Sequence, residues 1–176
     1  TLIGNTKPKE LEAQFKKAHS MLSQAVITVA DEKGVGLKKT FATFNGTNYA
    51  NASEIANAIY NQMKVTGTCT YTDKVKTYNK ASDNPYVDLG TVKPSKLLAN
   101  GMCMQVNVNG HMINITVDIN GAKKRPNALG QDIFYFYIDD NDTLQPKRMS
   151  KLYTDEEVEE LKKGDASGVE NCSAQA

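Results

Sequence analysis

The clearest pattern in the chain is a one-sided apolar stripe near its start. Between residues 8 and 31 apolar side chains recur at steps of three or four, which is the spacing of one face of an α-helix. Because the stripe has only one side, we expect this helix to lie on a sheet. The side chains expected to hold the helix to the sheet are Leu11, Phe15, Leu22, Val26 and Val29.

The next seventy residues give weaker signals. Residues 51–66 predict a second, shorter helix, because their apolar positions again share one face. Residues 69–75 alternate as a strand does, whereas residues 76–94 are polar and predict a long loop. Residues 95–101 fit either a helical turn or a strand that ends in a turn.

The strongest β signal is a hairpin. Two alternating runs, residues 102–108 and 111–119, meet at Asn109-Gly110. Asn-Gly favours a two-residue hairpin turn because both central positions need a positive φ. Two further strands are predicted after the hairpin, at residues 133–139 and 143–149, and the last carries a proline that suits an edge strand.

The order of these elements predicts an α+β fold. Residues 154–164 predict a short C-terminal helix, with a capping box at its start and Gly164 at its end. Helices followed by an antiparallel meander favour α+β over a parallel α/β sheet. We therefore expect a long N-terminal helix packed on an antiparallel sheet, with a short second helix and a short C-terminal helix.

The chain is predicted to form one domain over residues 1–176. Its parts are the N-terminal helix at 8–31, a helix-and-loop region at 32–100, the sheet at 101–149, and a C-terminal helix and tail at 150–176.

Composition and charge narrow the choice of partners. Lys and Arg total 21 against 20 Asp and Glu, so the formal net charge is +1 and no overall field attracts nucleic acid or an anionic membrane. No apolar run reaches the roughly 18–20 residues that a membrane helix needs. The chain begins at Thr1 without a methionine, so we expect an upstream segment to have been removed.

The chain offers little for catalysis. Its cysteines are Cys69, Cys103 and Cys172, none of them in a Cys-x-x-Cys pair, and its only histidines are His19 and His111. A zinc site of the usual spacing is thereby excluded. No nucleophile elbow, phosphate-binding loop or dinucleotide motif occurs, so no catalytic residue is predicted. The cysteine count allows one disulfide with one thiol left over, or three free thiols.

A polar loop between two predicted strands carries the candidate metal ligands. Asp118, Asn120 and Asp132 offer the hard oxygen atoms that calcium prefers, and calcium is the one cofactor the sequence suggests. The helix-loop-helix calcium pattern does not fit, because the twelfth position counted from Asp118 is Leu129 instead of glutamate. The favoured interpretation is that these side chains bond to their own backbone and fix turns.

Two segments resemble type IV pilin-like proteins and type II secretion pseudopilins. FKKAHSMLSQA at residues 15–25 is similar to the stretch just beyond the membrane-spanning half of the long helix in that family, with His19 in place of the usual tyrosine. VDINGAKKRPNALGQDIF at residues 117–134 resembles a second family segment in which Gly, Pro and Asp recur at fixed offsets. This chain carries a slightly longer basic run before the proline.

The resemblance implies a structural, non-enzymatic role. The chain would be a subunit of a type IV pilus or a type II secretion pseudopilus, assembled through its N-terminal helix with copies of itself or other pilins. It would be membrane-anchored before assembly and located at the cell surface, an oxidising environment that favours disulfide formation. A bond from Cys172 to Cys69 or Cys103 would suit the family, and a Cys69–Cys103 bond stays open.

The alternative is a binding module without a filament-building role. A minor pilin or secreted adhesin could use the loops at 76–94 and 118–132 to hold DNA, calcium or a surface ligand. The near-neutral charge gives nucleic acid no support.

Overall fold

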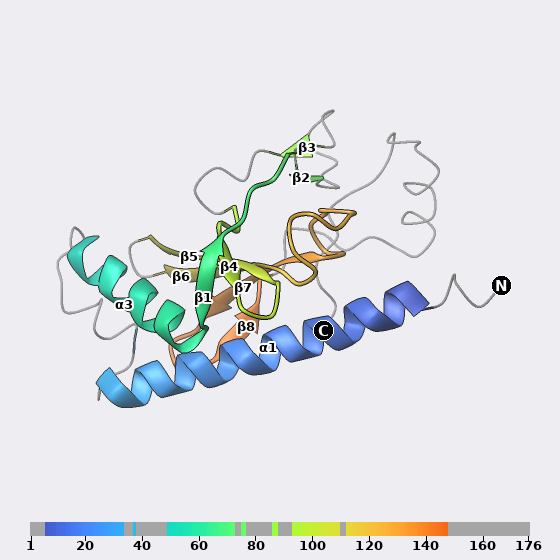
Figure 1. Cartoon of the computed structure of the whole chain (residues 1–176). Helices are drawn as coiled ribbons and strands as arrows, with labels where there is room; N and C mark the ends of the chain where they lie inside the picture. Colours follow the sequence, from blue (N-terminus) through green and yellow to red (C-terminus); the bar gives the residue numbers. More distant parts are fainter. Residues whose placement is uncertain are drawn as a thin grey trace.

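A computed structural model of the chain describes residues 6–33, 37, 49–72, 75–76, 86–87, 93–109 and 112–147. Within them, two helices lie beside a six-stranded antiparallel sheet (Figure 1). Helix α1 spans Thr6–Lys33 and helix α3 spans Tyr49–Gln62. A separate two-stranded sheet is formed by β2 (Val75–Lys76) and β3 (Tyr86–Val87).

The large sheet has the order β1-β4-β5-β6-β7-β8. Its strands are β1 (Val65–Thr68), β4 (Lys96–Leu98), β5 (Cys103–Asn109), β6 (Met112–Asp118), β7 (Ile133–Ile138) and β8 (Leu144–Pro146). From β4 onward each strand pairs with the next one in the chain, as in a meander. The first pairing is different, because β1 joins β4 across the segment that holds β2 and β3.

One face of the sheet forms the core. Val106, Ile115 and Phe136 are successive partners across β5, β6 and β7, and all three are buried. Val106 and Phe136 alternate with more exposed neighbours, as the two-residue period of a strand requires, whereas Thr116 beside Ile115 is also buried. The same core cluster contains buried side chains from both helices, so sheet and helices share one apolar interior.

The apolar stripe of α1 lies in this core. Phe15, Leu22, Val26 and Val29 are buried, and Leu11 is half-buried against them. The Phe15 ring meets the Phe134 ring edge-on at 4.7 Å between centroids and stacks near Phe136 at 5.8 Å. Such aromatic contacts add about 0.5–1.5 kcal/mol to the gain from burial.

The predicted fold class is wrong in its account of the helical layer. The chain is α+β, but a long helix packed on the sheet is only partly shown: α1 contacts β8 and, through Phe15, β7, and it also contacts α3. Helix α3 lies on β5, where the Tyr60 hydroxyl accepts the backbone N–H of Val106 at 2.7 Å. A local apolar period defines which side of a helix is buried, but it does not say which element buries it.

Two predicted boundaries are also wrong. Helix α3 ends at Gln62 instead of continuing to 66, because Lys64 takes a φ of 50° and β1 begins at Val65. The strand predicted at 69–75 is absent from residues 69–72, which follow β1 without ladder partners. Residues 95–101 form a strand, β4, and then a turn.

Several predictions fall outside the described residues. They concern the glycine of the Asn109-Gly110 turn, His111, the helix at 154–164 and Cys172. Neither described helix combines the length and the apolar content needed to cross a membrane.

Candidate functional site

The candidate site is the connection between β6 and β7, residues 119–132. Asp118 ends β6 and is the register partner of Ile133, the first residue of β7, so Asp132 lies at the same end of the sheet. Both aspartates have no exposed surface. Two carboxylates are therefore buried together where the loop leaves the sheet and returns to it.

Asp118 holds the start of the loop. Its Oδ1 accepts the backbone N–H of Gly121 at 2.8 Å and that of Asn120 at 3.2 Å, which is the turn that aspartate favours. Gly121 has a φ of 85°, and a Cβ added there would lie 2.4 Å from the carbonyl oxygen of Gly101. Only glycine fits this turn, because the neighbouring backbone fills the space of a side chain.

Asp132 holds the end of the loop. Its Oδ1 accepts the N–H of Ala128 at 2.6 Å, and its Oδ2 accepts the N–H of Asn127 at 2.8 Å. The Asn120 side chain also donates its Nδ2 to Asp132 Oδ2 at 3.2 Å. The two ends of the loop are thus joined through one amide.

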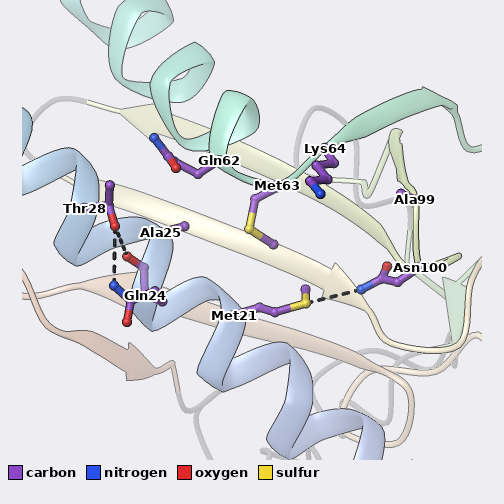
Figure 2. Close-up of a pocket in the computed structure, with 9 residues that line it drawn as sticks. All are labelled: Met21, Gln24, Ala25, Thr28, Gln62, Met63, Lys64, Ala99 and Asn100. Atoms are coloured by element: carbon purple, nitrogen blue, oxygen red, sulfur yellow. Dashed lines mark hydrogen bonds between the residues drawn. The ribbon is translucent and has the colours of Figure 1, made fainter.

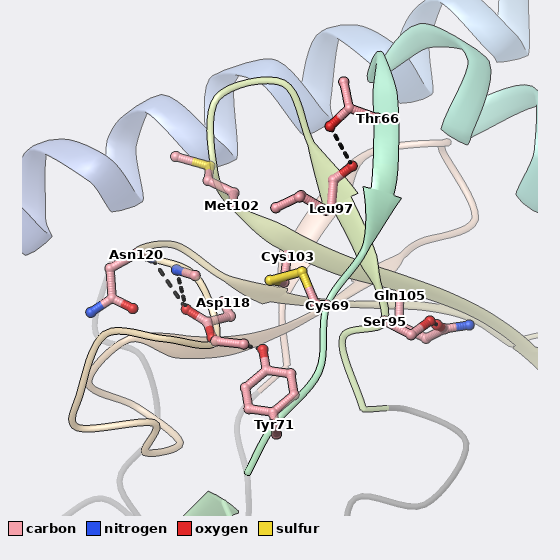
Figure 3. Close-up of a disulfide and its surroundings, with 12 residues drawn as sticks. Thr66, Cys69, Tyr71, Ser95, Leu97, Met102, Cys103, Gln105, Asp118 and Asn120 are labelled. Atoms are coloured by element: carbon pink, nitrogen blue, oxygen red, sulfur yellow. Dashed lines mark hydrogen bonds between the residues drawn. A yellow bond between two sulfur atoms is a disulfide. The ribbon is translucent and has the colours of Figure 1, made fainter. Parts of the chain in front are cut away.

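A third anchor comes from the segment after β1. The Tyr71 hydroxyl donates to Asp118 Oδ2 at 2.7 Å (Figure 3). Two residues earlier, Cys69 forms a disulfide with Cys103, and the Cα atoms are 6.1 Å apart. Cys103 is the register partner of Asp118, so the disulfide and the tyrosine bind one short segment to neighbouring positions on β5 and β6.

Burial changes the acidity of all three groups. It raises the pKa of Asp118 to about 6, and the charge on Asp132 adds to the rise while the Tyr71 hydroxyl opposes it. Burial also raises the pKa of Asp132, against the effect of the Ala128 and Asn127 N–H groups. The pKa of Tyr71 is raised by burial and by the Asp118 carboxylate, so the hydroxyl keeps its proton at neutral pH and can donate it to Asp118.

The structure brings the three predicted calcium ligands together. Each of the four carboxylate oxygens of Asp118 and Asp132 already accepts at least one hydrogen bond, and Asn120 presents its N–H donor to Asp132. In the described part of the chain, no three His, Cys, Asp or Glu side chains are grouped to hold a metal. Calcium binding stays a prediction.

Three cavities lie near the described elements. The first, of about 530 Å³, lies between the start of α1 and the loop, and its lining includes Glu10, Leu11, Gln14, Asn120, Lys124 and Pro126.

The second, of about 340 Å³, lies between α1 and the end of α3. Figure 2 shows the Met21 side chain on α1 and the Met63 side chain just after the end of α3 at this cavity, with Asn100 donating its amide to the Met21 sulfur. The third, of about 600 Å³, lies beside Cys69 and Tyr71.

A scan of family models, a search of curated proteins and a search of solved structures each return no match to this chain.

Sequence reasoning missed two members of the site. Tyr71 is 47 residues from Asp118, and nothing in its local pattern signals a carboxylate partner. Gln14 lies on α1 between buried stripe positions and looks like a surface residue, yet its Oε1 is buried. His19, considered for chemistry, instead packs half-buried beside the rings of Phe15 and Phe136.

Proposed function

We propose that the chain is a structural subunit of a type IV pilus or a type II secretion pseudopilus, and that it assembles through its N-terminal helix. The observation that carries this proposal is the outer side of α1. Exposed residues recur along it at steps of three or four, as a second stripe opposite the buried one, and they are Lys9, Ala13, Lys17, Ser20, Gln24, Ile27 and Asp31.

This outer stripe runs along nearly the whole helix, which forms one side of the molecule (Figure 1). The first turns of α1 extend beyond the strands of the sheet. Ile27 keeps 49% of its surface exposed and is the one large hydrophobic residue of this stripe. A long helix with an accessible outer side is suited to side-by-side packing with helices of other copies.

The disulfide bond supports the proposal that the chain functions outside the cytoplasm. The Cys69–Cys103 disulfide joins the segment after β1 to a central strand. Disulfides persist in oxidising compartments and are rare in the cytosol. The proposed subunit is held in the membrane before assembly and is then exposed at the cell surface, with copies of itself or other pilins as its partners.

Filament assembly in cells that express the intact gene tests this proposal. Surface filaments are sheared off, quantified by immunoblot and labelled with an antibody to this chain. Ile27→Asp is expected to lower the filament yield at least about tenfold, because burying an unpaired charge in an interface costs several kcal/mol and about 1.4 kcal/mol is a factor of ten.

Met112→Asp is the matched control. Met112 is also 49% exposed, but it lies on β6 and is not part of the outer stripe of α1. The control variant is expected to assemble normally, and both variants should melt like the wild type. Equal yields from both variants, or a gene with no apolar segment of about 20 residues upstream of Thr1, would reject the proposal.

A further inference from the structure

The outer stripe of α1 carries a cation and a carboxylate that have no ionic partner within the described part of the chain. Lys17 and Asp31 are both exposed, and neither forms an ion pair with a described residue. The adjacent Lys16, by contrast, is paired with Glu12 at 2.7 Å. Because Lys17 and Asp31 have opposite charges and lie on one surface, each can find its partner on a second copy of the same chain.

Lys17 and Asp31 belong to a line of three exposed side chains. Lys17, Gln24 and Asp31 follow one another at seven-residue steps, which is about two turns of an α-helix, so they lie on the same side of α1. The two charges are about 21 Å apart along the helix axis, at about 1.5 Å per residue, and Gln24 lies midway between them. The line is therefore symmetric in position about Gln24 and opposite in charge at its two ends.

This line is complementary to itself when two helices run antiparallel. A parallel pair in register would place Lys17 against Lys17 and Asp31 against Asp31, and like charges that face each other across an interface are unfavourable. An antiparallel pair centred on Gln24 places Lys17 of each copy opposite the partner's Asp31. It also brings the two Gln24 amides together, and each amide can both donate and accept a hydrogen bond. The two copies are then related by a twofold axis, as in most homodimers.

The same pairing covers the exposed isoleucine of the stripe. Ile27 keeps 49% of its surface exposed. In the antiparallel pair it comes level with the partner's Ser20 and the partner's Met21, which lie three or four residues from Gln24 on its other side. Ser20 is exposed and small, so it leaves room for the isoleucine side chain. Exposed ion pairs contribute little affinity by themselves, so the burial of two isoleucines supplies attraction and the charges determine the direction.

We propose that the outer stripe of α1 is a homodimer interface, in which α1 of one copy packs antiparallel on α1 of a second copy about Gln24. The contact covers residues 17–31, so it is smaller than the roughly 1,200–2,000 Å² of a standard interface and the dimer is a weak one. This dimer goes beyond the proposed filament. The N-terminal ends of its two helices point in opposite directions, so it forms between copies that are not anchored in one membrane.

Sedimentation velocity of the full chain, from about 10 µM to about 1 mM, covers the affinities of weak interfaces and measures the dimer. Every protein carries Cys172→Ser, because the Cys69–Cys103 disulfide leaves Cys172 as the one further cysteine, and its thiol can link two copies by itself. The sedimentation coefficient is expected to rise with concentration toward that of a dimer. Melting curves confirm that each variant is folded.

Charge reversal tests the contact between Lys17 and the partner's Asp31. Lys17→Glu brings carboxylates together at both ends of the interface and is expected to weaken the dimer at least about tenfold. Lys123→Glu makes the same charge change at an exposed lysine of the β6–β7 connection and should leave the dimer unchanged. Combining Lys17→Glu with Asp31→Lys restores opposite charges at both ends, so the double variant should dimerise like the wild type.

Disulfide trapping tests the direction of the helices. Gln24→Cys is expected to link to a second copy in the presence of oxidised glutathione, because the two positions meet at the twofold axis. Lys9 is also exposed on the stripe, but in the antiparallel pair the two Lys9 positions are about 45 Å apart along the axis, so Lys9→Cys should not link. A parallel pair in register would link at both positions.

Four results would overturn the proposal. They are a monomer at every concentration, equal dimerisation of Lys17→Glu and Lys123→Glu, no recovery in the double charge variant, and linking of Lys9→Cys as fast as Gln24→Cys. Filament yield does not enter these measurements, so the dimer and the filament can each be rejected without the other.

Discussion

Replacing Asp118 by asparagine changes the charge of the loop anchor while keeping its shape. The asparagine Oδ1 can still accept from Gly121 and Asn120, and its Nδ2 can donate to the Tyr71 hydroxyl, which is able to accept. The variant therefore isolates the cost of holding a charged carboxylate in a buried position. It also removes the repulsion between Asp118 and the Asp132 carboxylate.

The size of the effect follows from the pKa. Burial raises the pKa of Asp118 from 3.8 to about 6 in the folded chain, so the folded state binds this proton more tightly than the unfolded state. The stability that this proton adds is fully present below pH 3.8, the pKa of the Asp118 carboxyl in the unfolded chain. It is lost as the pH rises through about 6, the pKa in the folded chain. A shift of this size corresponds to about 3 kcal/mol, of which about 2 kcal/mol is lost between pH 4.5 and pH 7.5.

Urea unfolding of wild type and Asp118→Asn at several pH values measures this effect. The difference in unfolding free energy, variant minus wild type, should be about 2 kcal/mol larger at pH 7.5 than at pH 4.5. The corresponding difference in Tm should be about 4–8 °C larger. Asp31→Asn, which removes an exposed carboxylate from α1, controls for net charge. A difference between variant and wild type that stays constant with pH, or grows toward acid, would refute the reasoning.

Further measurements test the other anchors. Tyr71→Phe should lower stability at pH 7.5 by about 1.5–3 kcal/mol, and by less at pH 4.5, because it removes a donor to a carboxylate; an equal loss at both pH values would contradict this. Cys69→Ser should cost about 4 kcal/mol in urea unfolding, given the 34-residue separation of the bridged cysteines, and a variant as stable as the oxidised wild type would argue against the bond. Gly121→Ala should lower the free energy of unfolding by about 1–3 kcal/mol more than Gly101→Ala, because both glycines have a φ of 85° but only Gly121 meets backbone; equal losses would exclude the steric argument. Millimolar calcium should leave the melting temperature unchanged, since the carboxylate oxygens already have donors, whereas a rise that Asp118→Asn abolishes would establish a calcium site.

Sequence periodicity located the elements whose signals are local. Alternation places β5, β6 and β7 within a residue or so of their observed bounds, because one side of each strand is buried in the core. The apolar stripe of α1 likewise predicted which side of the helix is buried. The helix boundary near Lys64 was missed because a single residue with positive φ, and not a change in composition, ends the α3 region.

Contacts between residues far apart in the sequence could not be predicted from local hydrophobic patterns. Helix α3 contacts β5 through residues far apart in the sequence, such as Tyr60 and Val106, which are 46 residues apart. The acidic loop illustrates the same limit. Its Asp and Asn residues indicated a fixed turn, and they form one, but the burial of both carboxylates depends on Tyr71 and on the disulfide beside it. Local chemistry predicted the turn, whereas tertiary packing buries its two carboxylates and raises their pKa.

The small sheet of β2 and β3 has a consequence for how this chain can vary. Lys76 and Tyr86 are register partners, so the two strand ends that the intervening sequence connects lie at adjacent points of one ladder. Doubling the length of such a stretch costs only about 0.6 kcal/mol of closure entropy. A longer or shorter connection between β2 and β3 is therefore inexpensive, and it leaves the pairing of the separate six-stranded sheet unchanged.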